Sequence, residues 1–260
     1  MVLADKVAVV TGSGGAGCGR AIARRLARDG ASLVASDINE DGGCETVRQI
    51  EAAGGRAAFF RADVRSETDM RALVEFAVRR FGGLTLLVNN ASGGIHEPGG
   101  FFDHFAATLQ IELFGTLYAT RFAMEAIRRS GGGAIVNMSS ISGLWHGRKK
   151  PVGFEAYDVA KCAVIRLTTT LAPLAEKEGV RVNCLAPGWI ATEEVRTYWE
   201  SLTLDQRLER GAPSKLLQPE EIADAVVRLA TDESLCGRIL VWWSEDSPTL
   251  IRWGDRGYGE

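Results

Sequence analysis

Short apolar runs alternate along the chain with longer segments in which apolar residues recur every three or four positions. The runs have the length and β-branched content of strands and cover 6–11, 32–37, 57–63, 84–90, 133–140 and 181–187. The segments between them have helical spacing and cover 20–30, 40–54, 68–82, 105–130 and 157–179. Strands that are apolar along almost their whole length need helices on both faces. The pattern therefore predicts a doubly wound α/β fold with a parallel sheet of about seven strands.

No linker divides the chain, because no Pro/Ser-rich stretch, charge run or internal repeat interrupts it. With 260 residues and 46% hydrophobic content, the chain is long enough to bury one large core. We therefore expect a single domain over residues 1–260.

The composition argues against several classes of protein. A net charge of −3 with scattered basic residues gives no electrostatic footprint for nucleic acid. The chain has no uninterrupted apolar run of about 18 residues and no signal-peptide pattern, so we expect a cytoplasmic protein without a membrane partner. The five cysteines form no CxxC pair and the three histidines lack metal-ligand spacing, so reduced thiols and no metal site are expected.

The first strand runs into a glycine-rich turn, TGSGGAGCG (11–19), that opens a helix. Glycines there let the backbone approach a pyrophosphate, while the helix N-terminus supplies N–H donors. Asp37 ends the second strand, 20 residues beyond Gly17, as in a dinucleotide site. A P-loop fits less well because Cys18-Gly19 replaces the Lys-Ser/Thr pair that holds phosphate and magnesium. The turn therefore indicates a nucleotide cofactor.

Tyr157 and Lys161 are spaced four apart in a predicted helix, so both side chains project from one face. A free tyrosine has a pKa of about 10 and a free lysine one of about 10.4. A fixed cation beside the phenol favours the tyrosinate, so the pair indicates a group able to transfer a proton.

Taken together, these motifs resemble those of the short-chain dehydrogenase/reductase family over roughly residues 5–238. The matching positions are Thr11-Gly12 with Gly17 and Gly19, Asp63-Val64, NNAS at 89–92, Ser140, Tyr157 with Lys161, and Pro187-Gly188 with Thr192. The resemblance implies a Rossmann-like, NAD(P)-binding enzyme.

The resemblance also implies the catalytic roles. Tyr157 would be the general acid/base that exchanges a proton with the substrate oxygen, and Lys161 would lower its pKa and bind the nicotinamide ribose. Ser140 would hold the same substrate oxygen and polarise a carbonyl.

Cofactor contacts are implied in the same way. The pyrophosphate would be surrounded by Gly12, Gly17 and Gly19, and the adenine by Asp63 and Val64. Asn89 would lie below the cofactor. The segment toward the carboxamide would comprise Pro187, Gly188, Ile190 and Thr192. Asp37 would accept the adenosine ribose hydroxyls and repel a 2′-phosphate by up to roughly 4 kcal/mol per charge at 4 Å and a dielectric of 20. NAD is therefore expected in preference to NADP.

Three features depart from the family pattern. The glycine loop carries one extra residue, which leaves open whether Gly14 or Gly15 lies against the cofactor. Glu112 stands where the family commonly has an asparagine behind the lysine; it could bridge a water, pair with Lys161, mark a weakened catalyst, or point elsewhere. The tail 239–260 lacks the usual Asp-Gly-Gly.

We expect the substrate pocket to be walled by the segments at about 141–156 and 189–215. Their aromatic residues would suit a hydrophobic or cyclic alcohol or ketone, although each could equally belong to the core or a subunit contact: Trp145, Phe154, Trp189, Tyr198 and Trp199. The leading function is NAD-dependent oxidation of a secondary alcohol or reduction of a ketone. The alternative is a catalytically quiet NAD-binding regulatory or scaffold protein. An enoyl reductase of this fold would normally have a wider tyrosine–lysine spacing.

Members of the family usually pair through two long helices, which here correspond to about 101–129 and 157–177. Leu113, Leu117, Ala163, Leu167 and Leu171 lie on them at helical spacing beyond one sheet-facing stripe. A wider core face would also explain that pattern. We expect a homodimer or a homotetramer.

Overall fold

A single twisted sheet runs through the molecule. The computed structural model describes residues 1–93, 104–144, 155–252 and 254. In spatial order the strands are β3 (Arg56–Arg61), β2 (Ser32–Asp37), β1 (Val7–Thr11), β4 (Leu86–Asn89), β5 (Gly133–Met138), β6 (Val180–Pro187), β7 (Ile239–Trp242) and β8 (Thr249–Leu250). The first seven pair in parallel and β8 is antiparallel to β7. The predicted parallel sheet is thus confirmed, with one short antiparallel strand that the sequence pattern did not predict.

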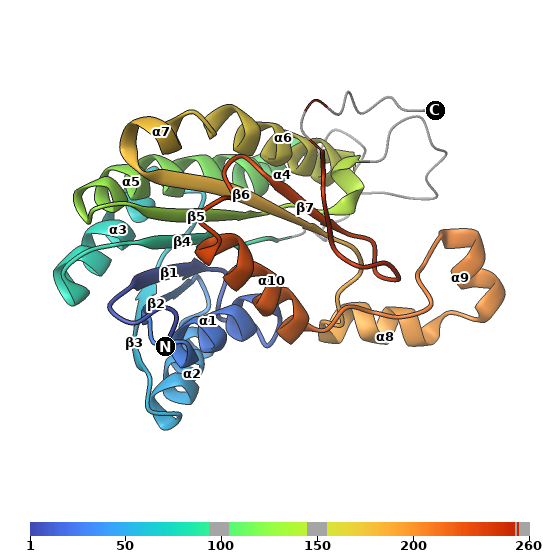
Figure 1. The fold of residues 1–260 in the computed structure, drawn as a ribbon. Helices are drawn as coiled ribbons and strands as arrows, with labels where there is room; N and C mark the ends of the chain where they lie inside the picture. The colour runs from blue at the N-terminus through green and yellow to red at the C-terminus, as the bar shows by residue number, and fades with distance from the viewer. Residues whose placement is uncertain (94–103, 145–154, 253, 255–260) are drawn as a thin grey trace.

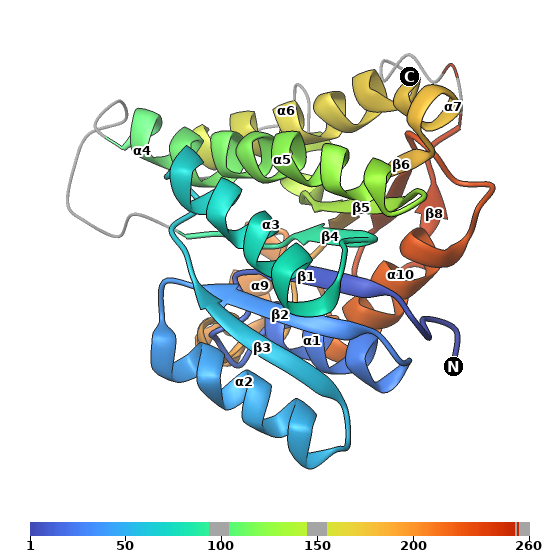
Figure 2. The same cartoon turned by 90° about the vertical axis from the view of Figure 1, so that its left-hand side faces the viewer.

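Helices cover both faces of this sheet (Figures 1 and 2). One face carries α1 (Cys18–Arg28), α2 (Glu40–Ala52) and α10 (Pro219–Thr231), and the other carries α3 (Glu67–Phe81), α5 (Gly115–Arg129) and α6 (Glu155–Leu171). Each layer has its own apolar core. Ile22 and Leu26 of α1 lie in one, and Leu73 of α3 and Ile127 of α5 lie in the other.

The predicted helices 105–130 and 157–179 are each interrupted. The first consists of α4 (Phe105–Leu109), a π-helical turn η1 (Gln110–Phe114) and α5. The second ends as α6 at Leu171 and resumes as α7 (Leu174–Glu178), because Pro173 lacks the N–H that a continuous helix needs. The π turn lies beside the candidate site described below.

The strand order reverses at β1, whose neighbours are β2 and β4. Ligands of such sheets bind beyond the carboxyl ends of the strands at this point. Two further helices, α8 (Glu193–Ser201) and α9 (Leu204–Arg210), follow β6 and bury none of their residues, and Figure 1 shows them extending away from the sheet. A 3₁₀ turn, η2 (Ile141–Leu144), follows β5. Within the described residues, no helix has the length and apolar content needed to cross a bilayer.

Candidate active site

Ser140, Tyr157 and Lys161 meet just beyond the carboxyl end of β5. Ser140 stands two residues after the end of β5, and its Oγ accepts a hydrogen bond from the N–H of Ser142 at 3.1 Å. Tyr157 and Lys161 lie one turn apart on α6, with the lysine Nζ 5.3 Å from the centre of the phenol ring. A hydrogen bond also joins the Ser140 and Tyr157 side chains. The chain therefore holds a hydroxyl, a phenol and an ammonium in one cluster.

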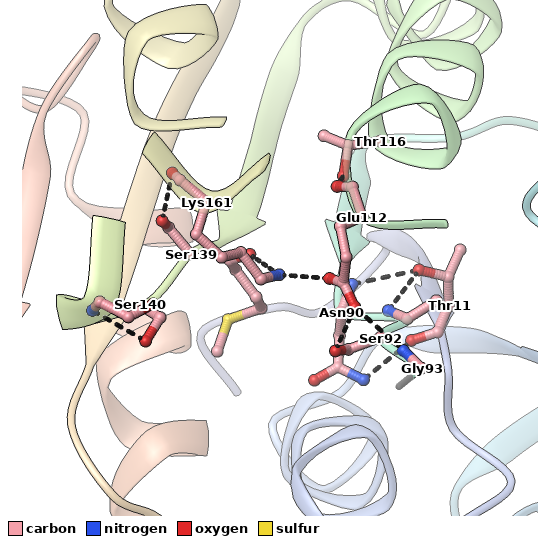
Figure 3. A network of polar contacts seen from close by, with 12 residues as sticks. Thr11, Asn90, Ser92, Gly93, Glu112, Thr116, Ser139, Ser140 and Lys161 are labelled. Atoms are coloured by element: carbon pink, nitrogen blue, oxygen red, sulfur yellow. Dashed lines mark hydrogen bonds and ion pairs between the residues drawn. The ribbon is translucent and has the colours of Figure 1, made fainter. Parts of the chain in front are cut away.

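Lys161 is almost fully buried and its ammonium has two protein partners (Figure 3). Nζ donates to the carbonyl oxygen of Met138 at 2.9 Å and forms an ion pair with Oε2 of Glu112 at 2.8 Å. The helix is fixed to the strand end as well, because Ser139 Oγ donates to the carbonyl of Lys161 at 2.7 Å. The ammonium is thus held between β5 and the π turn η1.

Glu112 therefore pairs directly with Lys161, one of the alternatives that the sequence left open. Its side chain is 1% exposed. Its second oxygen, Oε1, accepts hydrogen bonds from Ser92 Oγ at 2.7 Å and from the N–H of Gly93 at 3.0 Å. Both carboxylate oxygens thus have protein partners, and the Glu112–Lys161 ion pair lies within the candidate site (Figure 3).

The charges around the phenol oppose one another. The pKa of Tyr157 lies above its ordinary value, mainly because burial disfavours the anion, and Glu112 raises it further, while Lys161 and the Ser140 hydrogen bond act to lower it. Burial on its own would lower the pKa of Lys161, but the Glu112 carboxylate and Tyr157 outweigh it, so that pKa is also raised. At neutral pH Lys161 is consequently an ammonium and Tyr157 a neutral phenol.

The glycine turn lies against the end of β4. Gly12 has a φ of +68°, and a Cβ there would lie 2.5 Å from the Cα of Ala91, whereas a Cβ on Gly19 would lie 2.0 Å from the carbonyl oxygen of Gly12. The turn is fastened by Asn90, whose Nδ2 donates to the carbonyls of Thr11 and Gly12 at 3.0 Å each. Asn90 belongs to the NNAS motif at 89–92, in which only Asn89 was expected to contact the cofactor; its place after the buried end of β4 was the available signal for this role.

Asp37 lies beside this turn, as its position at the end of β2 predicted. Its Oδ2 accepts from the N–H of Gly14 at 2.8 Å and its Oδ1 from that of Asn39 at 2.9 Å. Gly14 is packed against this carboxylate, since a Cβ on it would lie 2.8 Å from Asp37 Cγ. Gly15 is exposed, and the nearest atom to a Cβ there would be the backbone nitrogen of Gly17 at 4.0 Å, an ordinary van der Waals contact.

The segment after β6 closes the same end of the sheet. Thr192 caps α8 by accepting from the N–H of Val195, and its Cγ2 would lie 3.2 Å from a Cβ on Gly17. Gly188 and Trp189 follow Pro187, and both lie against the buried Ser244, whose Oγ accepts from the N–H of Trp189 at 3.0 Å. Ile190 forms an isolated parallel bridge with Leu217. The segment PGWIAT (187–192) and the glycine turn thus face each other.

Asn89, Asp63 and Val64 have other partners in the structure. Asn89 is buried, and its Nδ2 donates to Thr120 Oγ1 at 3.0 Å and to Asn137 Oδ1 at 2.8 Å, so its side chain joins β4 to β5 and α5. Asp63 pairs with Arg65, whose hydrogen bonds hold the pKa of the carboxyl below its usual range. Val64 packs on the backbone of Gly115. Their expected contacts with a cofactor stay predictions.

The strand ends fit a dinucleotide. They combine a turn in which side chains are excluded at Gly12 and Gly19, a helix N-terminus at α1 and an oriented carboxylate at Asp37. Among the described residues, no cluster of three or more metal-ligating side chains occurs.

Comparison with known proteins agrees with this geometry. A family model described as "Enoyl-(Acyl carrier protein) reductase" matches residues 14–238. Cyclohexanol dehydrogenase of Acinetobacter sp. (strain SE19) is 35% identical over 236 residues, which cover 88% of this chain and 89% of that protein. The 7alpha-hydroxysteroid dehydrogenase of Escherichia coli K12 is 32% identical over 244 residues, or 92% of each chain. The chain belongs to the short-chain dehydrogenase/reductase family.

A solved structure of a 7 alpha-hydroxysteroid dehydrogenase with NADH and 7-oxo glycochenodeoxycholic acid superposes with a TM-score of 0.80 at 30% identity. The match covers 92% of this chain and 93% of that one. The predicted family, the Rossmann-like fold and the oxidoreductase class are thereby confirmed. Although the family model is named for an enoyl reductase, these relatives are dehydrogenases, and Tyr157 and Lys161 keep the close spacing that argues against an enoyl reductase.

Three of the five aromatic residues expected around the substrate pocket of this short-chain dehydrogenase/reductase are described. The rings of Trp189 and Tyr198 stack with centroids 6.0 Å apart, and Trp199 lies under the guanidinium of Arg207. Trp145 and Phe154 lie outside the described residues, as do most of segment 141–156 and the end of the tail.

Proposed function

We propose that this short-chain dehydrogenase/reductase interconverts a secondary alcohol on a ring and the corresponding ketone, with NAD(H) as cofactor. The cluster of Ser140, Tyr157 and Lys161 beside the glycine turn is the observation that carries the proposal. Relatives named for cyclohexanol and for a hydroxysteroid support the cyclic substrate. The stacked Trp189 and Tyr198 would offer such a ring a flat apolar wall.

The proposed chemistry follows from the three side chains. During oxidation the Tyr157 phenolate accepts the hydroxyl proton, and Ser140 Oγ donates a hydrogen bond to the same substrate oxygen. The Lys161 ammonium stabilises the phenolate electrostatically. When bound, the nicotinamide supplies the acceptor for the hydride that leaves the alcohol carbon. In the reverse direction the neutral phenol donates its proton to the ketone oxygen.

The direction of the pH dependence follows from the raised pKa of Tyr157. Oxidation needs the phenolate, which is present above that pKa, and reduction needs the neutral phenol, which is present below it. Oxidation should therefore rise with pH into the alkaline range, and reduction should fall there.

Asp37 supports NAD rather than NADP. Its two oxygens are oriented by backbone N–H groups and retain acceptor capacity for two ribose hydroxyls, while its charge would repel a 2′-phosphate. In the same proposal, Gly15 with Gly17 lies against the pyrophosphate because Gly14 is packed against Asp37. We further propose that the enzyme is a cytoplasmic homodimer or homotetramer with one domain over residues 1–260.

The test is a screen of cyclic secondary alcohols, beginning with cyclohexanol and 7α-hydroxysteroids, with NAD at alkaline pH. Absorbance of the reduced cofactor reports turnover, and the Tyr157→Phe variant is the control. We expect that variant to keep NAD binding and to lose on the order of 10²–10⁴-fold or more in rate, because only the proton carrier is deleted. Near-normal turnover by the variant would refute the mechanism. NAD binding without turnover of any alcohol would instead favour a catalytically quiet regulatory protein.

A further inference from the structure

Glu112 reaches the catalytic lysine from an irregular helical turn. The π-helical segment η1 carries one more residue per turn than an α-helix would, and it lies between α4 and α5. A Cβ on the next residue, Gly115, would lie 2.8 Å from the Cβ of Val64. The start of α5 therefore packs closely against the segment that follows β3. This turn directs a carboxylate into the core beside Lys161, where its side chain is 1% exposed.

The carboxylate connects two parts of the site. Oε2 contacts the ammonium of Lys161 at 2.8 Å on α6. Oε1 binds Ser92 and Gly93, which follow the end of β4 and lie three residues or fewer beyond Asn90, the side chain that fastens the glycine turn. A single side chain therefore fixes the lysine relative to the strand end at which the cofactor is expected.

The charge of Glu112 acts on both titrating groups of α6. It raises the pKa of Lys161 and also that of Tyr157, since an anion favours a neighbouring cation and disfavours a neighbouring anion. Other groups face the pair: Cys184 of β6, whose pKa is raised to about 12 by burial, and Asp158 on α6 itself. His104 precedes α4, which packs against α6, whereas the neighbouring η2 carries no titratable side chain.

We propose that Glu112 is a positioning residue that sets the pH window of catalysis, holding Lys161 charged while offsetting part of its field at Tyr157. An asparagine at this place could bind the same turn but would carry no charge. The inference rests on the proposed function for its kinetic test, but it also makes a claim about the protein without substrate.

The experiment compares two variants that separate charge from shape. Glu112→Gln keeps the length of the side chain and removes its charge, and Glu112→Asp keeps the charge on a shorter side chain. In Glu112→Gln the Tyr157 phenolate should form at lower pH, and the Lys161 ammonium should be lost at lower pH. The rising and the falling limb of the pH–rate profile for oxidation should therefore both move to lower pH by on the order of one unit. In Glu112→Asp the limbs should stay close to those of the unaltered protein while kcat falls. The KM for NAD should change by about twofold or less in Glu112→Gln.

A titration of the cofactor-free protein decides the same question without turnover. The ultraviolet absorbance of tyrosinate is followed against pH, and the contribution of Tyr157 is obtained by subtracting the Tyr157→Phe protein. We expect the midpoint to be lower in Glu112→Gln than in the unaltered protein and in Glu112→Asp. Equal midpoints in folded proteins, as judged by circular dichroism, would overturn the proposal. If no alcohol is oxidised but the midpoint moves as expected, the proposed function fails and the role of Glu112 stands.

Discussion

At the scale of single residues, the carboxylate of Asp37 is oriented by the protein backbone itself. The N–H groups of Gly14 and Asn39 each donate to a different oxygen, which fixes the plane of the group at the end of β2. A pre-oriented acceptor loses less conformational entropy when it binds a ribose.

We expect Asp37→Ala to narrow the preference for NAD over NADP. The change removes an acceptor for the ribose hydroxyls and also a charge that would repel a 2′-phosphate, so NAD should bind more weakly and NADP more tightly. Fluorescence titration with NADH and NADPH measures both affinities. Asp37→Asn is the control, because it keeps an oxygen but removes the charge. An unaltered protein that prefers NADPH would contradict the assignment.

Residue spacing brought Tyr157 and Lys161 forward, because helix geometry puts positions four apart on one face, whereas Ser140 followed only from the family resemblance. The same reasoning could not decide what Glu112 does. Its direction depends on the π turn, which shifts the helical phase by about one residue and has no periodic signature in the sequence. The buried hydrogen-bond partners of Asn89 could not be predicted either, since they lie on another strand and on a helix far along the sequence.

At the scale of elements, the contact between η1–α5 and the end of β3 depends on a missing side chain. Gly115 begins α5, and Val64 follows β3 in the sequence. The space between them leaves no room for a methyl group, since the added Cβ would lie 2.8 Å from a branched carbon of a packed residue.

Gly115→Ala should therefore destabilise the protein by about 1–3 kcal/mol through overpacking. Thermal or urea unfolding measures the change. Gly15→Ala is a matched control, because a methyl group there has no neighbour closer than 4.0 Å and should alter stability by no more than about 0.5 kcal/mol. Adding Val64→Ala should recover part of the loss in Gly115→Ala, and a loss that is fully additive would show that the two residues do not interact.

Hydrophobic periodicity predicted most of the helices and strands. Where the predicted elements differ from the structure, the cause is local. The two long predicted helices were interrupted because periodicity is almost unaffected by one π turn or by a single proline near a helix end. The strand β8 has only two residues, too few for any alternation to be recognised.

At the scale of the whole molecule, α5 and α6 leave apolar surface uncovered. Leu117 of α5 is 38% exposed and Val159 of α6 is 50% exposed. Leu167 and Leu171 of α6, and Leu113 of the adjoining η1, are only half-buried. Such a face on two neighbouring helices is typical of a contact between subunits.

We expect light scattering at micromolar concentration to give a mass of at least twice 28.0 kDa. Leu117→Glu should shift the protein toward smaller species, since a charge would then be buried at the contact. Arg121→Glu on the same helix serves as a comparison, because it replaces one exposed charge by another and breaks only the surface ion pair with Glu67. A stable monomer of the unaltered protein would exclude the predicted assembly.

The parallel sheet and the position of the site beyond the carboxyl ends of its strands could be anticipated from the alternation of strands and helices. Strand neighbours, however, are set by long-range packing, and the closure of the sheet by the tail was not foreseen. The only signal in the tail was the absence of the usual Asp-Gly-Gly.

That closure bears on aggregation. A parallel sheet ends in two rows of backbone groups without partners, and each row can template another chain. At one edge, β3 begins and ends with the charged Arg56 and Arg61. At the other, the pairs of Leu240 with Leu250 and Val241 with Thr249 cover an apolar strand. Because β8 is synthesised after β7, a nascent or truncated chain ending before residue 249 would expose the edge of β7, and β8 therefore protects this edge from pairing with another chain.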